Sequence, residues 1–387
     1  MAFTLEQFGL SAERGYLSSF EIDEIALPDG FDEMLDAASQ LSAIITTGRA
    51  RHLLRQVGYP DIPAFLDSAN NEQIRVAMVH YSFLVQAYVW GEPEAPTTLP
   101  ANLAVPIVAI ADNLGLAPLL PYSGYVLDNW YRLDKNAGIT LDNIGMYQNF
   151  LGGQDENWFV LVHVAIEAEA GMALELATRL VTAAKEQDAA EVEAMLIAMN
   201  ATWDRINAHF DRMVDRCDPY IYFQRVRPYI HGWKNNPAMP DGLIYEGVEH
   251  YAGKPQAFCG QTGSQSSIVP AMDALFQVVH QSDPLREFLD ELHRYRPPTH
   301  RAFIDAIREQ STLRNFAKTQ NSSLKDAFNA CVEQVARFRS RHLEYAASYI
   351  NKQASSGAGN NPDVGTGGTP FMKYLKKHRD ENRAQTI

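Results

Sequence analysis

The feature that most constrains the fold of this chain is a long apolar run at residues 157–186, NWFVLVHVAIEAEAGMALELATRLVTAAKE. Apolar residues recur in this run at steps of three and four, which is the period of an α-helix. At its start the run is apolar on nearly all sides, and a helix of that kind must be covered by other elements. The sequence therefore predicts a central helix with further helices packed around it.

Helical periodicity also marks most of the remaining chain. Further helix patterns cover residues 31–48, 71–90, 191–217, 267–281 and 323–349, and a last helical piece covers 371–384. Residues 1–30 form an irregular lead-in, and residues 220–247 mix aromatics, prolines and glycines, which indicates a packed loop with short irregular pieces. We find no internal repeat and no strand-rich region, so the predicted fold class is all-α.

The length of 387 residues is enough to bury a large core and allows more than one domain. A proline-rich connection, GEPEAPTTLPANLAVP, leads towards a glycine-containing break at LGG, about residue 152. We therefore expect a small N-terminal domain at residues 1–150 and a large helical domain at residues 151–387. Within the second, the low-complexity segment at about 355–370 is expected to be a mobile Gly-rich loop.

The charge balance excludes some classes of partner. With a net charge of −14, the chain lacks the excess of Lys and Arg on which binding to nucleic acid or an anionic membrane depends. The N-terminal residues do not read as a secretory signal, and no stretch of about 18 apolar residues predicts a membrane span. Cys217, Cys259 and Cys331 are widely spaced and odd in number, which favours reduced thiols. These features predict a cytoplasmic protein with a small-molecule partner.

Two residues of the helix predicted at 323–349 are candidates for a binding site. His342 falls on the apolar stripe of this helix, where a neutral imidazole suits an iron ligand. By spacing alone, a histidine on an apolar face is more often a core residue held by its own hydrogen bond. Arg339, one turn earlier, could pair with an anionic group of a ligand or be a solvated charge.

Other candidates lie in apolar or glycine-rich surroundings. His163 sits in the run WFVLVHVAIEA, where a buried imidazole needs a partner or a role in a site. Arg227 lies between aromatic and apolar residues, and it is either a clamp for a substrate carboxylate or part of an internal ion pair. The GTGGT segment is a flexible hinge, or a lid in which Thr366 offers its hydroxyl to a ligand. The small residues of FCGQTGSQSS make either an ordinary turn or a close approach to a flat ligand.

Several segments taken together resemble the indoleamine 2,3-dioxygenase branch of the haem-dependent tryptophan dioxygenases, from about Leu99 to about Leu375. They are LPANLAVP, PYSGYVLDNW, WFVLVHVAIE, RPYIHGWKNNPAMPDGLIYEG, FCGQTGSQSSIVPAMDALF, YRPPTHRAFI, FRSRHLEYAASYI and GTGGTPFMKYLKKHR. Each is weak alone, but the ordered set is specific. The resemblance implies an all-helical fold, with a small N-terminal domain covering the distal haem pocket of a large haem domain.

The resemblance also implies cofactors and residue roles. The cofactor would be haem b, with O₂ as co-substrate. His342 matches the proximal iron ligand, and Arg339 matches an arginine that contacts a haem propionate. Arg227 matches the arginine that binds the substrate carboxylate, and Thr366 matches a threonine of the loop that closes over the substrate. The positions that line the substrate or the distal haem face are Tyr122, Tyr125, Val126, Phe159, Val160, Tyr222, Ile230, Thr262 and Gly263, with Thr262 and Gly263 also beside the haem.

Four residues depart from the family pattern. His163 replaces a serine of the indoleamine branch, whereas the tryptophan 2,3-dioxygenase branch has a distal histidine that can accept from the indole N–H. Tyr222 replaces a phenylalanine near the substrate, Val160 replaces an aromatic residue, and Gln261 replaces a glycine beside the haem. The pocket should therefore be more polar, which allows an altered choice of indole. We expect His163 to be catalytic, either by accepting from the indole N–H or by orienting O₂.

The function implied by the resemblance is dioxygenation of L-tryptophan, or a close indole derivative, to N-formylkynurenine, with a reductant of unknown identity keeping the iron ferrous. Two alternatives stay open at this point. One is a haem-dependent oxygenase that inserts one oxygen into, or rearranges, a substituted tryptophan in a biosynthetic route. The other is a noncatalytic haem protein that senses or stores a ligand. The mass of the product and substrate-dependent O₂ consumption distinguish the three.

Overall fold

The computed structural model describes residues 3–282, 284–353 and 372–387. Helices dominate this part of the chain, and its strands are short, which confirms the all-α class. The strands are β1 (Thr98–Leu99), β2 (Trp130–Arg132), β3 (Ile144–Met146) and β4 (Ile244–Tyr245). β1 pairs with β4 in parallel, and β2 pairs with β3 antiparallel. These short ladders connect loops rather than form a core sheet.

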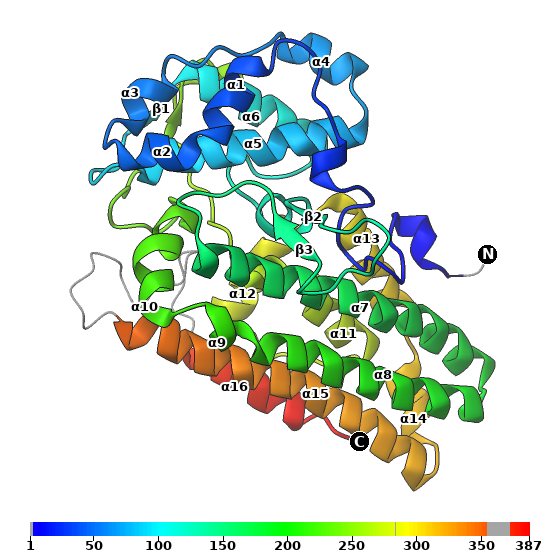
Figure 1. Cartoon of the computed structure of the whole chain (residues 1–387). Helices are drawn as coiled ribbons and strands as arrows, with labels where there is room; N and C mark the ends of the chain where they lie inside the picture. The colour runs from blue at the N-terminus through cyan, green and yellow to red at the C-terminus, as the bar shows by residue number, and fades with distance from the viewer. Residues whose placement is uncertain (1–2, 283, 354–371) are drawn as a thin grey trace.

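The predicted central helix is α7, Gln154–Glu186, which is buried along most of its length. It packs against α8 (Ala189–Asp211), and it contacts α11 (Ile268–Leu275), α13 (Pro298–Gln310) and α14 (Leu313–Lys318). The remaining helices of this half are α9 (Met213–Arg216), α10 (Pro219–Ile221), α12 (Pro284–His293), α15 (Ser322–Ala346) and α16 (Met372–Arg383). Figure 1 shows α7, α8 and α15 running side by side, with α16 against α15.

The first half of the chain forms a second group of helices around α5. The members are α1 (Asp32–Ser39), α2 (Leu41–Thr46), α3 (Ala50–Leu54), α4 (Ile62–Ser68), α5 (Asn71–Trp90) and α6 (Ala101–Leu114). The side chains of Asn70 and Gln73 form a capping box that fixes the start of α5, where the periodicity predicted it. Figure 1 shows this group at one end of the molecule, away from α8 and α15.

Short single turns complete the described elements. The 3₁₀ turns are η1 (Leu5–Phe8), η2 (Ile22–Glu24), η5 (Arg227–Ile230), η6 (Glu249–Tyr251) and η7 (Gly263–Gln265). The π turns are η3 (Ser123–Leu127), η4 (Tyr222–Val226) and η8 (Ala347–Asn351). Single π turns are frequent at functional sites, and η3 and η4 contain several of the predicted site residues.

The structure differs from two predicted helices and from one predicted connection. Residues 31–48 form two helices, α1 and α2, that meet at Gln40. The helix expected at 267–281 ends at Leu275, and Gln277 adopts a left-handed conformation with φ of 51°. The proline-rich connection contains α6 with Pro106 inside it, because burial of its apolar face offsets one lost backbone hydrogen bond.

The lead-in at residues 1–30 returns to the second half of the chain. A Cβ at Gly15 would lie 2.2 Å from the carbonyl oxygen of Glu167, and one at Gly171 would lie 2.4 Å from that of Ala12. Both positions therefore require glycine, because the lead-in rests directly on the backbone of α7. η1 also packs against α13. The N-terminal residues thus hold the two halves together.

The predicted domain boundary falls at the turn before α7. The Glu156 carboxylate accepts backbone N–H hydrogen bonds from Phe150 at 2.7 Å, Leu151 at 3.1 Å and Gly152 at 2.8 Å. These bonds hold the turn where the chain passes from one group of helices to the other. The division into domains at residues 1–150 and 151–387 remains a prediction.

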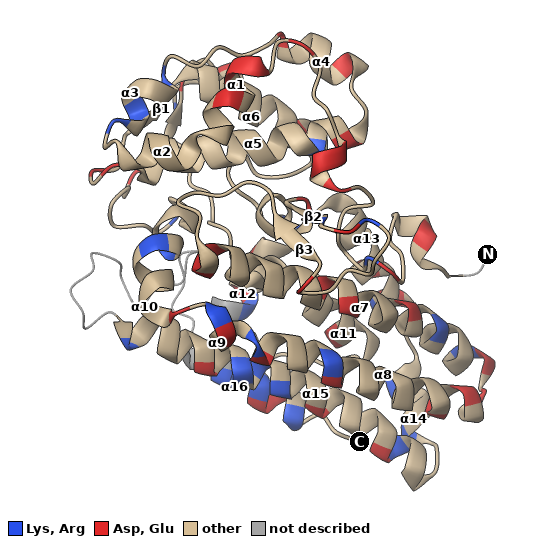
Figure 2. Cartoon of the chain, in the orientation of Figure 1, with Lys and Arg blue, Asp and Glu red and all other residues tan. Residues whose placement is uncertain are grey.

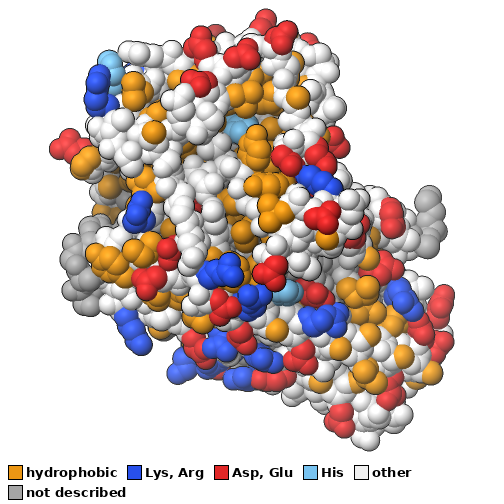
Figure 3. Space-filling view, viewed as in Figure 1, with side chains coloured by type: hydrophobic (Ala, Val, Ile, Leu, Met, Phe, Trp, Pro, Cys, Tyr) orange, Lys and Arg blue, Asp and Glu red, His pale blue; other side chains and the backbone are white. Residues whose placement is uncertain are grey.

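The surface carries charges of both signs close together. Figure 2 shows Lys and Arg beside Asp and Glu along α8, α15 and α16, where ion pairs join Arg341 to Asp211 and Arg383 to Glu333. In the view of Figure 3, hydrophobic side chains are scattered between such charges. None of the described helices is long and apolar enough to cross a membrane.

Candidate functional site

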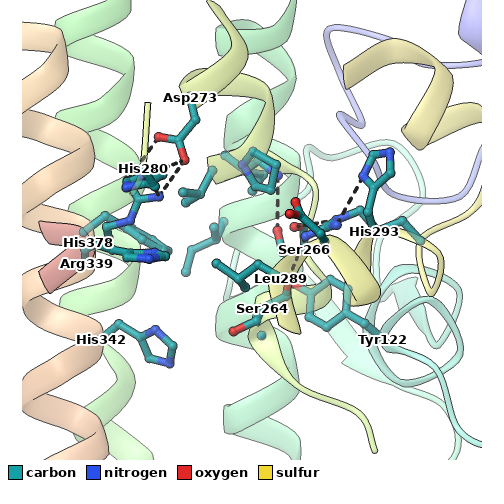
Figure 4. Close-up of a pocket in the computed structure, with 18 of the residues that line it drawn as sticks. Tyr122, Ser264, Ser266, Asp273, His280, Leu289, His293, Arg339, His342 and His378 are labelled. Carbon is teal, nitrogen blue, oxygen red and sulfur yellow. Dashed lines mark hydrogen bonds and ion pairs between the residues drawn. The ribbon is translucent and has the colours of Figure 1, made fainter. Parts of the chain in front are cut away.

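A cavity of about 350 Å³ lies between α7, α8, α11, α12 and α15. Its volume is in the range of small-molecule sites. Among the predicted site residues, those that line it are Tyr122, His163, Gly263, Arg339 and His342. Apolar side chains form much of the remaining wall, including Ile166, Phe210, Val269, Pro270, Leu289 and Phe338. Figure 4 shows His342, Arg339 and Tyr122 arranged around this space.

His342 stands on α15 with its ring at the cavity wall. Within the part of the chain that the structure describes, neither ring nitrogen makes a hydrogen bond; the ring packs against Phe210, with 6.5 Å between centroids. Loss of hydration lowers the pKa of His342 to about 4, and the nearby His163 and Arg339 act in the same direction. The imidazole is therefore neutral at physiological pH, and it presents a lone pair to the cavity.

His163 lines the same cavity from α7. Its Nδ1 lies 2.7 Å from the carbonyl oxygen of Phe159, which can only accept, so Nδ1 carries the proton. Nε2 is then an acceptor, and a Cβ placed at Gly263 would lie 3.9 Å from it. Burial lowers the pKa of His163, with the bond to Phe159 opposing this effect. The cavity therefore has a neutral hydrogen-bond acceptor in one wall.

Arg339, one turn before His342, is held by a carboxylate. Its two Nη atoms donate to Asp273 on α11, at 3.2 and 2.7 Å, and one of them also contacts Asn382 on α16. Burial alone would raise the pKa of Asp273, but Arg339 and His280 hold it well below its usual range. The guanidinium of Arg339 is thus fixed at the cavity edge, and Figure 4 shows it beside Asp273.

The Gly/Ser/Thr loop predicted beside the ligand forms another wall. Thr262 begins η7 and accepts from the backbone N–H of Ser264. Arg296 donates to the carbonyl oxygens of Ser264 at 2.8 Å and Ser266 at 3.2 Å, and so holds the loop in place. The sequence analysis missed Arg296, although its position between aromatic and proline residues in RYRPP was a signal.

Glu167 is a second residue that the sequence analysis missed. Its Oε1 accepts from the hydroxyl of Tyr122 at 2.8 Å and from that of Ser266 at 2.7 Å, and both donors line the cavity. Burial raises the pKa of Glu167 to about 7, against the lowering effect of these two bonds. An acidic residue four positions after His163 in an apolar run was the available signal.

This raised pKa predicts a dependence of stability on pH. Because the folded-state pKa of Glu167 lies above its unfolded value, its contribution to stability is present at low pH and is lost as pH rises through about 7. We expect Glu167→Gln to reduce the loss of unfolding free energy between pH 5 and 8 by about 1–3 kcal/mol. Urea unfolding at the two pH values measures this, with the exposed Glu186→Gln as control. Equal pH slopes in wild type and Glu167→Gln would refute the prediction.

The other predicted substrate residues form an aromatic cluster beside the cavity. Phe159 connects the two, since its ring lies 4.8 Å from His163 and 4.8 Å from Tyr222. Tyr125 is fully buried, and its hydroxyl has no hydrogen-bond partner among the described residues. Val126 in η3, Val160 in α7 and Ile230 in η5 are also buried.

Arg227 is fully buried at the start of η5. Its guanidinium lies 5.4 Å from the ring of Phe223, and burial lowers its pKa, with Tyr222 opposing this effect. An arginine stays protonated even so, so a cation is buried next to the aromatic cluster. It does not line the cavity that holds His342 and His163. Thr366 lies outside the described residues.

The residues present fit a haem. A flat apolar macrocycle needs apolar walls, its iron needs a neutral nitrogen ligand, and its carboxylates need cations at the edge. The cavity has these features in its apolar lining, in His342, and in Arg339 together with Arg296. Fold and site together define an all-helical protein with a cavity suited to this cofactor.

Comparison with known proteins agrees with this class. Residues 4–385 match the family model described as indoleamine 2,3-dioxygenase. The chain is 31% identical to indoleamine 2,3-dioxygenase 1 of Rattus norvegicus, over 98% of this chain and 95% of the rat protein. It is 31% identical to indoleamine 2,3-dioxygenase 2 of Homo sapiens, over 98% and 94% of the two chains. For indoleamine 2,3-dioxygenase nanC of Aspergillus nanangensis the identity is 29%, over 97% and 96%.

The chain therefore belongs to the indoleamine 2,3-dioxygenase family. It is a haem-dependent dioxygenase that uses haem b and takes O₂ as co-substrate. The predicted enzyme class and cofactor are thus confirmed.

Proposed function

We propose that this enzyme inserts both atoms of O₂ across the C2–C3 bond of the indole ring of L-tryptophan and so forms N-formylkynurenine. The observation that carries the proposal is the placement of two neutral histidines, His342 and His163, in the walls of one cavity, next to an aromatic cluster with a buried arginine. An aromatic wall, a neutral hydrogen-bond acceptor and a buried cation suit an amino acid with a flat aromatic side chain.

In this proposal His342 holds the haem iron and Arg339 binds a haem propionate, with Thr262 and Gly263 beside the macrocycle. Haem, when bound, supplies the iron that binds and activates O₂. The neutral state of His342 supports its role, because a protonated imidazole has no lone pair for a metal. The protein's own contribution would be to exclude water and to hold the indole beside the haem.

The aromatic cluster would hold the substrate itself. Together with neighbouring side chains, the residues that would contact the substrate are Tyr122, Tyr125, Val126, Phe159, Val160, Tyr222 and Ile230. Arg227 binds the carboxylate, and Thr366 closes over the amino-acid end. Support comes from the buried hydroxyl of Tyr125, which has no hydrogen-bond partner among the described residues and which a polar group of a ligand would satisfy.

His163 would accept a hydrogen bond from the indole N–H through Nε2. We expect His163→Ala to lower kcat/KM for L-tryptophan by about 5- to 100-fold, the effect of losing one buried hydrogen bond. The loss should be much smaller for 1-methyltryptophan, which has no N–H to donate. Steady-state kinetics with both substrates measure the difference. Equal losses for the two substrates would exclude this role for His163.

The mass of the product tests the proposed reaction. The haem-loaded enzyme, reduced anaerobically and then supplied with L-tryptophan and ¹⁸O₂, should yield N-formylkynurenine that carries two labelled oxygen atoms. A product with one labelled oxygen would favour the monooxygenation of a substituted tryptophan, for which the more polar surroundings of His163 and Tyr222 leave room. Haem binding without O₂ consumption in the presence of any indole would contradict both reactions.

A further inference from the structure

Three side chains of the kind that bind metals meet at the edge of the cavity, away from His342. One nitrogen each from His280 and His378 and one carboxylate oxygen from Glu381 all lie within 4.8 Å of one another. Both histidines are buried, and both line the cavity. Figure 4 shows the two beside Asp273 and Arg339. We call this group the His280 cluster.

The fold brings the cluster together from two distant parts of the chain. His378 and Glu381 are three residues apart on α16, so they share one face of that helix. His280 comes from the segment after α11, which leaves the helical path at Gln277. The rings of His280 and His378 are stacked, with 4.3 Å between centroids and 17° between planes.

His280 has a carboxylate on each side. Its Nε2 lies 3.2 Å from Oδ2 of Asp273, and its Nδ1 lies 2.8 Å from Oε2 of Glu381. A neutral imidazole has one N–H and can donate to only one of them. If Nε2 donates to Asp273, the lone pair of Nδ1 faces the carboxylate of Glu381. A divalent cation bound to both atoms would satisfy this tautomer. In the other tautomer, Nε2 accepts from Nη2 of Arg339 at 3.5 Å and Nδ1 donates to Glu381.

The contacts of Asp273 favour a metal. Asp273 is itself fixed by the two hydrogen bonds from Arg339, so it can orient the His280 ring through Nε2. A carboxylate that accepts from the distal N–H of a histidine is the usual support of a metal-bound imidazole. Two histidines and a glutamate are also a donor set of zinc sites that keep a fourth position for water.

We propose that the His280 cluster binds a divalent metal ion of the zinc type through His280 Nδ1, a ring nitrogen of His378 and the carboxylate of Glu381. The ligand atoms lie up to 4.8 Å apart, whereas two ligand atoms of a tetrahedral zinc site lie about 3.3 Å apart. Side-chain rotations that move each atom by about 1 Å would therefore bring them to the distances of a metal site. The ion would fasten α16 to the segment after α11, next to Arg339. This proposal does not depend on the identity of the indole.

The test uses the haem-loaded enzyme, in which the iron site is filled. After treatment with a chelator, the protein is titrated with zinc, and bound metal is measured by mass spectrometry after gel filtration. Zinc K-edge absorption, which the haem iron does not disturb, reports the ligands. We expect one zinc per chain with two imidazole ligands, and an increase in Tm on binding.

Two variants and a control make the result specific. His378→Ala and the nearly isosteric Glu381→Gln should weaken zinc binding by about 100-fold or more. Glu381 is not part of the cavity lining, so Glu381→Gln should leave the Soret band unchanged. His250→Ala, which removes an exposed histidine paired with Asp112, should bind zinc as the wild type does. Absence of stoichiometric zinc would overturn the proposal and leave His280 held by hydrogen bonds to its neighbours alone. Zinc binding that both cluster variants retain would overturn it as well.

Discussion

Replacement of His342 by alanine is expected to abolish stable haem binding and to lower O₂ consumption with L-tryptophan by more than about 100-fold. The reason is that His342 is the cavity-lining imidazole that is kept neutral and makes no hydrogen bond with any described residue. The haem content per chain and the Soret band of the purified variant measure the first effect. O₂ uptake after reduction measures the second.

A rescue experiment separates loss of the ligand from loss of the fold. A His342→Gly variant leaves a hole the size of the side chain, and added imidazole should restore both haem binding and part of the activity. His209→Ala is the matched control, because His209 stands on the adjacent α8 and contacts Glu169 instead of the cavity. A His342→Ala protein with the haem content and Soret maximum of the wild type would rule out His342 as the iron ligand.

Replacement of Arg227 by leucine is the second prediction with a large effect. We expect kcat/KM for L-tryptophan to fall by about 30- to 150-fold, which corresponds to the loss of about 2–3 kcal/mol from a charged hydrogen bond to the substrate carboxylate. KM should rise, and kcat should fall as well, because the carboxylate contact aligns the indole as well as binding it.

A comparison of two substrates tests whether Arg227 binds the carboxylate. Tryptamine has the same indole but no carboxylate, so Arg227→Leu should change its kcat/KM much less than that of L-tryptophan. Arg225→Leu, two residues earlier in η4 and exposed, serves as the matched control and should behave as the wild type with both substrates. If Arg227→Leu impairs both substrates equally, the buried guanidinium supports the fold and does not bind substrate.

The local pattern predicted most of the helices correctly. α5, α7 and α15 begin and end close to the periodic segments, because a 3.6-residue period is a property of neighbouring residues. The helix predicted at 191–217 is divided into α8, which ends at Asp211, and α9. Predictions were wrong where a backbone feature or tertiary burial competes with the pattern. Gln277 stops α11 early through its left-handed conformation, and α6 continues through Pro106 because its apolar face is buried.

The sequence by itself thus determined the all-α fold, the position of His342 on a buried stripe and, through the ordered motifs, the family and its cofactor. Only the tertiary structure placed His163 in the wall of the same cavity as His342. It also showed the hydrogen bonds of Glu167 with Tyr122 and Ser266, and the contact of His280 with α16. The physical reason is that periodicity and propensity act over a few residues. Contacts between residues far apart in the chain, and the pKa shifts that follow from burial, depend on how the helices pack.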